Sequence, residues 1–74
     1  MGKRQEEKVL YIHTIYREDL SDPDWPSTWI EYRVSDSEKE PTFQEALYRG
    51  EESSGLDGAY TFIESVGAKA KFLD

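Results

Sequence analysis

The segment KVLYIHTIYREDLSDPDWPSTWIEYRVS, residues 8–35, decides the fold of this chain. Its first part, residues 8–17, is rich in β-branched and aromatic residues, which is typical of a strand. Its last part, residues 27–35, alternates apolar and polar side chains, which indicates a strand with one buried and one solvated face. Pro23 and Pro26 lie between the two and cannot donate ladder hydrogen bonds, so we expect an antiparallel hairpin with a long loop.

Both faces of the first strand carry apolar side chains. One face presents Val9, Tyr11, His13 and Ile15, and the other presents Leu10, Ile12, Thr14 and Tyr16. This pattern favours a central strand that is covered on both sides, by helices on one face and by a further element or a partner on the other. Which of the two faces meets the helices stays open at this stage.

Two helical segments are expected after the hairpin. Thr42 and Glu45 have the spacing of a capping box, which predicts a short helix over residues 42–50 that ends at Gly50. The apolar spacing of residues 56–66 predicts a second helix, with Gly67 as its terminator.

A competing interpretation treats Asp57-Gly58 as a hairpin turn followed by a strand over residues 60–66. We prefer the helix, because strand alternation fails at Phe62 and Ile63. Residues 68–73 alternate small or apolar side chains with lysines and predict a last, short strand.

The expected fold is therefore α+β, with element order ββααβ. Its three strands form an antiparallel sheet in the order 2-1-3, with both short helices on one face, and the connection from the second strand to the third is a split βαβ crossover. Residues 1–7 are polar and are expected to form a disordered arm, followed by one small domain over residues 8–74. No element of the chain is expected to cover the second face of the sheet, which would then expose an aromatic and apolar patch.

Charge limits the classes of partner. The chain has 74 residues, no cysteine and a net charge of −7, and residues 18–64 contain 13 acidic residues against three basic ones. Such a surface repels nucleic acids and acidic lipids and attracts basic protein surfaces, although solubility alone would also account for it. The sequence contains no secretory signal and no apolar run of the ~20 residues that span a membrane, so we expect a cytoplasmic protein.

Catalysis and metal binding find little support. His13 is the single histidine and lies mid-strand among apolar neighbours, so we expect a structural histidine and no enzyme. The spacing of Asp19, Asp22 and Asp24 invites comparison with a calcium loop, but prolines interrupt it and the glycine and final glutamate of an EF-hand are missing. We therefore predict no metal and no cofactor, with a sugar stacked on the tryptophans as a minor alternative.

Protein recognition remains. Tryptophan and tyrosine bury much area with few rotatable bonds, and nearby carboxylates steer towards lysines and arginines. The predicted partner-binding residues are Asp19, Asp22, Asp24, Trp25, Trp29, Tyr11 and His13.

The sequence thus predicts a small acidic, non-enzymatic interaction domain that docks on a basic surface of a protein partner. It would act as an inhibitor or regulator, in one version by presenting carboxylates where nucleic acid phosphates would lie. The alternative is an accessory subunit that self-associates, as a homodimer, through the open face of its sheet. Whether Trp25 packs on the core or faces a partner stays open.

Overall fold

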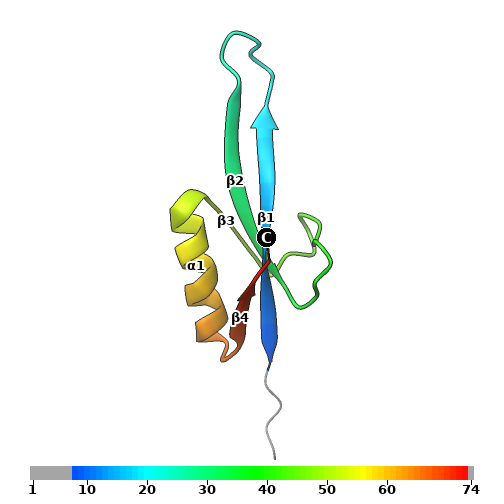
Figure 1. The fold of residues 1–74 in the computed structure, drawn as a ribbon, viewed down its shortest axis with the longest axis vertical. Coiled ribbons are helices and arrows are strands. Elements are labelled where there is room, and N and C mark those ends of the chain that lie inside the picture. Colours follow the sequence, from blue (N-terminus) through cyan, green and yellow to red (C-terminus); the bar gives the residue numbers. More distant parts are fainter. Residues whose placement is uncertain (1–7, 74) are drawn as a thin grey trace, which may run out of the picture.

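A computed structural model describes residues 8–73 as a four-stranded sheet with one helix on one of its faces (Figure 1). The elements are β1 (Val9–Asp19), β2 (Ser27–Ser35), β3 (Tyr48–Glu51), α1 (Glu52–Ser65) and β4 (Lys69–Phe72). The strands lie in the order β3-β2-β1-β4, and β4 runs parallel to β1 while the other pairs are antiparallel. The α+β class is confirmed, whereas the predicted three-stranded antiparallel sheet with two helices is wrong.

The central hairpin forms as the sequence predicts. β1 pairs with β2 without interruption, from Tyr11 opposite Ser35 to Asp19 opposite Ser27. The bounds of β2 match the predicted strand over residues 27–35, and β1 extends two residues beyond the predicted end. The predicted neighbours of the first strand, β2 on one side and the last strand on the other, are also correct.

The predicted helix over residues 42–50 is wrong, although its capping box exists. The Thr42 backbone N–H donates to the Glu45 carboxylate at 3.0 Å, and the Glu45 N–H donates to the Thr42 hydroxyl at 3.2 Å. The chain makes only one turn here and then enters β3, whose Tyr48 lies opposite Val34 of β2. Helix initiation is costly and short helices need packing to persist, and here the sheet edge provides a competing set of backbone bonds.

The helical interpretation of residues 56–66 is confirmed over the competing strand. α1 begins four residues before the predicted start, at Glu52, and packs the side of Ala59 and Ile63 on the sheet. Gly67 follows with φ +75°, the left-handed conformation that glycine adopts without strain at a helix end.

The predicted last strand forms as β4, but its direction is opposite to the prediction. The unexpected strand β3 adds one chain reversal between β2 and α1. β3 therefore runs parallel to β1, and the crossover through α1 brings β4 to the far edge in that same direction. The split βαβ unit is β3-α1-β4, and it spans both strands of the hairpin.

The apolar core lies between α1 and the sheet. The even-numbered face of β1 is the one that meets the helix, through Leu10 and Ile12, which resolves the choice that the sequence left open. The fully buried apolar residues are Leu10, Ile12, Val34, Ala59 and Ile63. The core is small, as expected of a chain of this length, which leaves a thin margin of stability.

The second face of the sheet is not open, contrary to the prediction. The segment 36–47 crosses this face and is held there by two contacts. Arg33 donates from Nη1 to the Pro41 carbonyl at 3.0 Å, and the Arg49 guanidinium lies 3.7 Å from the centroid of the Phe43 ring. The buried side chains beneath this segment are polar: His13, Glu31, Arg33 and Ser35. The face is thus covered by a loop and filled with hydrogen-bonded groups instead of presenting an apolar patch.

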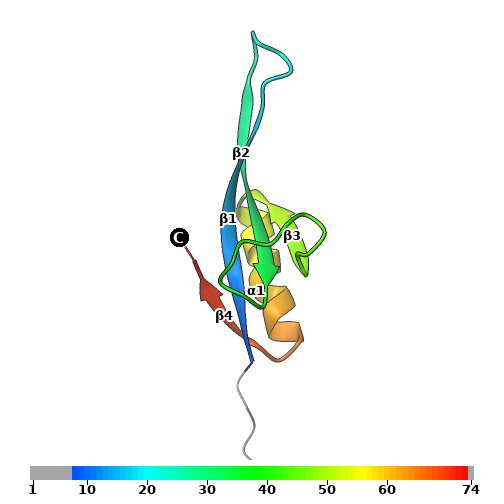
Figure 2. The same cartoon turned by 90° about the vertical axis from the view of Figure 1, so that its right-hand side faces the viewer.

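The hairpin projects beyond the rest of the molecule. β4 pairs with β1 only from Val9 to Ile12, and β3 pairs with β2 only from Glu31 to Val34. Residues 15–30, here called the arm, therefore form a two-stranded ribbon with a loop at its end, and Figure 2 shows it extending past α1 and both edge strands. The expected disordered segment 1–7 lies outside the described residues, and residues 8–73 contain no helix long and apolar enough to cross a membrane.

Candidate interaction site

The end of the arm, residues 18–26, is here called the tip. It contains the carboxylates of Glu18, Asp19, Asp22 and Asp24 and no basic residue. Two of these aspartates shape the loop, because the Asp19 carboxylate accepts the Ser21 N–H at 3.0 Å and that of Asp22 accepts the Asp24 N–H at 3.1 Å. Such bonds are characteristic of Asx turns, so the acidic residues fold the tip as well as charging it.

The bonds from Ser21 also act on the charge of the tip. The backbone N–H and the side chain of Ser21 hydrogen-bond the Asp19 carboxylate, and together they lower its pKa below the ordinary value. Asp19 is therefore held in the charged form that a basic partner would meet.

Trp25 does not pack on the core. Trp25 is 78% exposed at the tip, and Leu20 in the same loop is 62% exposed. The Trp25 N–H donates to the Asp22 carbonyl at 3.0 Å, which fixes the backbone of the turn while leaving the ring in solvent. An exposed indole ring surrounded by carboxylates is the kind of side chain that anchors protein–protein interfaces.

Trp29 has a different position, on the side of the arm that faces away from the helix. Its indole N–H donates to Glu51 at 3.1 Å, and the Arg17 guanidinium lies 5.9 Å from the centroid of its ring. The bond to Glu51 ties the base of the arm to β3, and the Arg17 contact lies between the two strands of the arm, so Trp29 stabilises the root of the arm and is only partly exposed.

Glu31 gathers the nearby cations at that root. Its side chain is 1% exposed, and it accepts hydrogen bonds from Arg17 at 2.8 Å, Arg33 at 2.7 Å and Arg49 at 3.3 Å. Burial alone would raise the pKa of Glu31, but the hydrogen bonds from Arg33 and Arg49 and the positive charges of Arg33 and Arg17 lower it below the ordinary value. The carboxylate therefore stays charged, and the arginine nearest the tip, Arg17, is committed to it.

Tyr11 and His13 lie apart from the tip. Both are on the body part of β1, where Tyr11 is opposite Ser35 and His13 is 5% exposed beneath the segment 36–47. The structure thus places Asp19, Asp22, Asp24 and Trp25 in the loop of the tip, places Trp29 at the root, and does not join Tyr11 or His13 to them. The seven predicted residues do not form one continuous surface.

His13 and Ser35 are within hydrogen-bond distance, which raises the question of a nucleophile with its base. His13 Nε2 lies 2.8 Å from Ser35 Oγ and 3.0 Å from the Ser37 carbonyl, and Ser35 Oγ donates to that same carbonyl at 2.8 Å. A carbonyl oxygen only accepts, so the bond from His13 Nε2 to Ser37 requires the tautomer with its proton on Nε2, and in that tautomer Nε2 does not accept from Ser35. These contacts fasten the start of the segment 36–47 to the sheet.

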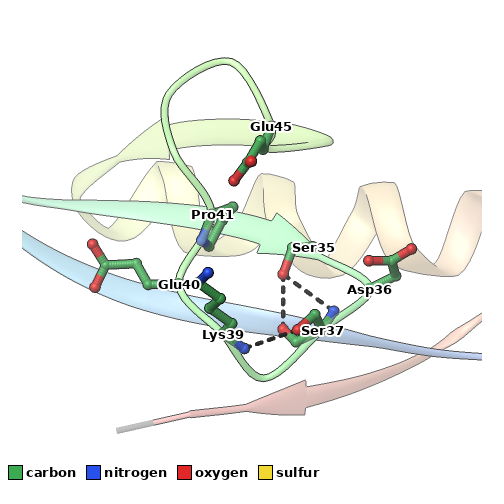
Figure 3. A pocket seen from close by; sticks show the side chains of 7 residues that line it. All are labelled: Ser35, Asp36, Ser37, Lys39, Glu40, Pro41 and Glu45. Atoms are coloured by element: carbon green, nitrogen blue, oxygen red, sulfur yellow. Dashed lines mark hydrogen bonds between the residues drawn. The ribbon is translucent and has the colours of Figure 1, made fainter.

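A pocket of about 250 Å³ lies where this segment leaves β2. Figure 3 shows its lining by the chain bend between Ser35 and Pro41 and by Glu45 from the following turn. The Glu45 carboxylate is already bonded to the Thr42 backbone, and the other charged side chains of the lining are Asp36, Lys39 and Glu40. Within residues 8–73, no three histidine, cysteine or carboxylate side chains gather in a way that could hold a metal ion.

Sequence reasoning missed the Glu31 group and Leu20. A signal for the group was present, because Glu31 and Arg33 alternate with apolar residues on β2, a pattern that was interpreted as a solvated face. The segment 36–47 buries that face, and the sequence predicts a helix from residue 42 onwards instead of a chain that crosses the sheet.

Comparison with known proteins adds no relative. No protein-family model matches the sequence, and neither the curated proteins nor the solved structures give a match.

Proposed function

We propose that this chain is a non-enzymatic protein-interaction domain that docks the tip of its arm on a basic surface of a protein partner, as an inhibitor or regulator. The observation that carries the proposal is the exposed Trp25 ring among four carboxylates at the end of a projecting hairpin. A projecting ribbon reaches a surface or cleft that the body of the protein does not approach.

The charge of the tip supports a basic partner. The nearest cation, Arg17, is bonded to Glu31, and the remaining arginines of the group also point to Glu31. The negative charge of the tip is consequently not neutralised by these arginines. It would speed encounter with a positively charged protein surface and repel an acidic one. Where the partner binds nucleic acid, the carboxylates would occupy the positions of phosphates.

The exposed apolar side chains support docking over charge steering alone. Leu20 and Trp25 are both exposed in the loop, and Asp22 and Asp24 lie between them in the sequence, so apolar contacts would be accompanied by ion pairs. Hot spots of protein interfaces have this organisation, with an aromatic anchor inside a polar rim. The two prolines of the loop limit the entropy that docking would cost.

The experiment is affinity capture from the source cells with the intact chain, followed by affinity measurements on the purified partner. Trp25→Ala is expected to weaken binding by about 30-fold or more, which corresponds to the 2 kcal/mol of a hot-spot residue. The double variant Asp22→Asn with Asp24→Asn is expected to weaken binding and to flatten its dependence on salt.

The matched control is Asp57→Asn with Glu64→Gln, which removes the same number of charges from the exposed surface of α1. This control should bind as the unaltered chain does. Binding that ignores salt, or equal losses for the tip and helix variants, would refute the proposal.

A further inference from the structure

The projecting part of β1 has an unpaired edge. The Lys69 N–H donates to the Lys8 carbonyl at 2.8 Å, and the Leu73 N–H donates to the Ile12 carbonyl at 2.9 Å. The backbone groups of even-numbered residues of β1 therefore point towards β4, as alternation along a strand requires. Tyr16 and Glu18 point their backbone groups to the same side, where no strand formed by residues 8–73 is paired with them.

This edge is regular. β1 continues its register with β2 to Asp19 without a bulge, and residues 14–19 contain no proline. Bulges and prolines commonly protect the edge strands of natural proteins, because an edge without them can pair with a further strand. A strand added here would continue the line of β4 towards the tip.

Apolar side chains border the edge on the helix side of the sheet. Tyr16 is 79% exposed and lies opposite the partly buried Ile30, and Phe72 is exposed at the end of β4. A strand placed between Phe72 and the tip would rest alternate side chains against these rings. Backbone bonds and alternating side-chain contacts together are the ordinary means by which an extended segment adds to a sheet.

Charge selects the occupant. The edge ends in Glu18 and Asp19 and leads to Asp22 and Asp24, so a second copy of this chain would bring like charges together in a molecule of net charge −7. An extended segment with lysine or arginine at alternate positions would pair with these carboxylates instead. Oppositely charged cross-strand neighbours stabilise pairing, and like charges oppose it.

We propose that the edge of β1 over residues 16–19 accepts an extended basic segment of a protein partner as an additional strand, in line with β4. The inference rests on the proposed function and adds how the partner is held: by backbone pairing along the arm, next to the charged tip.

The test uses a short synthetic peptide of alternating lysine and valine and the same peptide with alternate amides N-methylated. Hydrogen exchange of the full chain is followed residue by residue by NMR. Binding of the unmethylated peptide is expected to slow exchange of the Tyr16 and Glu18 amides about tenfold, while those of Ile15 and Arg17, already directed towards β2, change little. N-methylation removes the peptide N–H groups that would donate to the outward carbonyls of Tyr16 and Glu18. The loss of these two hydrogen bonds is expected to weaken binding about tenfold.

Two variants locate the edge. Tyr16→Pro removes an outward N–H on β1, and Thr28→Pro removes the corresponding outward N–H on the opposite edge of the arm, so only the first should abolish peptide binding. Circular dichroism verifies that both variants fold. If Tyr16→Pro does not fold, exchange at Tyr16 and Glu18 in the unaltered chain decides.

Each outcome separates the two proposals. Salt-sensitive binding without slower exchange at Tyr16 and Glu18 overturns the edge proposal and leaves tip docking in place. Slower exchange at these amides with salt-insensitive binding shows that a strand is added at this edge, but it overturns both docking by charge and the basic character of the occupant. Protection that rises with concentration of the chain alone assigns the edge to a second copy, and absence of peptide binding also overturns the inference.

Discussion

Replacing Glu31 with glutamine tests the account of the polar face. The carboxylate is 1% exposed and receives three guanidinium groups, one of which, Arg33, has a side chain only 9% exposed. Glutamine has almost the same shape but no charge, and its amide group would direct two donors at arginines that are also donors. The substitution therefore leaves a buried cation without its counter-ion.

The expected cost follows from that uncompensated charge. Removing one member of a buried ion pair costs about 3–5 kcal/mol of unfolding free energy. Domains of this size lose about 4–8 °C of Tm per kcal/mol, so we expect Glu31→Gln to lower Tm by about 12 °C or more. The control is Glu51→Gln on the same face, where the glutamine oxygen can still accept the exposed bond from the Trp29 indole, so the change in stability should stay within about 0.5 kcal/mol.

Thermal and urea unfolding followed by circular dichroism give both values. The reasoning fails if Glu31→Gln costs less than about 1 kcal/mol, a size typical of exposed pairs. It also fails if Glu51→Gln costs as much, because the loss would then be general to carboxylates on this face.

The pH dependence of stability provides a second check on the same residue. The pKa of Glu31 is lower in the folded chain than in the unfolded one, so its contribution is fully present above the unfolded-state value of about 4.3. It is lost as the pH falls through the lower, folded-state pKa. We expect the unaltered chain to lose stability steeply in this acid range and Glu31→Gln to show a shallower loss over the same pH values.

Three further predictions concern other parts of the chain. Gly55→Ala should destabilise by about 2 kcal/mol despite better helix propensity, because the added Cβ would meet the backbone of β3. Trp25→Ala should change unfolding free energy by less than about 0.5 kcal/mol, since its ring is in solvent. Thr42→Ala should cost about 1 kcal/mol by removing one side of the capping box. Urea unfolding measures all three, and a reversed order of Gly55→Ala and Trp25→Ala would contradict the packing described.

The sequence was most informative where periodicity and turn residues agreed. In β2, apolar residues alternate with polar ones and Pro26 precedes the strand, so its bounds and its pairing with β1 were predictable. In α1, Leu56, Ala59 and Ile63 share one helical face, and this period outweighed the turn signal at Asp57-Gly58. These were local patterns that tertiary contacts reinforced.

The errors arose where a local signal competed with a sheet edge. Thr42 and Glu45 do cap a turn, but Tyr48 gains more by stacking on Phe62 and donating to the Gly55 carbonyl than it would in a short exposed helix. Once residues 48–51 became a strand, the direction of β4 and the covering of the second face followed from chain connectivity. No pattern in residues 42–50 alone contains that information.

The tip residues were predictable and their arrangement was not. Composition singled out Asp22, Asp24 and Trp25, but only the position of the two edge strands shows that the hairpin projects. Tyr11 and His13 were grouped with them because an open sheet face was expected to present them with Trp29, but they lie at the opposite end of β1 from the tip and the segment 36–47 bonds to His13.

The length of the arm is independent of the packing of the body. Beyond the bonds of Trp29 to Glu51 and of Arg17 to Glu31, its outer residues are paired with one another and contribute nothing to the core. Each strand residue adds about 3.3 Å, so deleting facing pairs such as Glu18 with Thr28 would shorten the reach in steps while the remaining register is kept. Reach and fold are thus set by separate residues, and the distance between body and tip is open to adjustment without repacking the body.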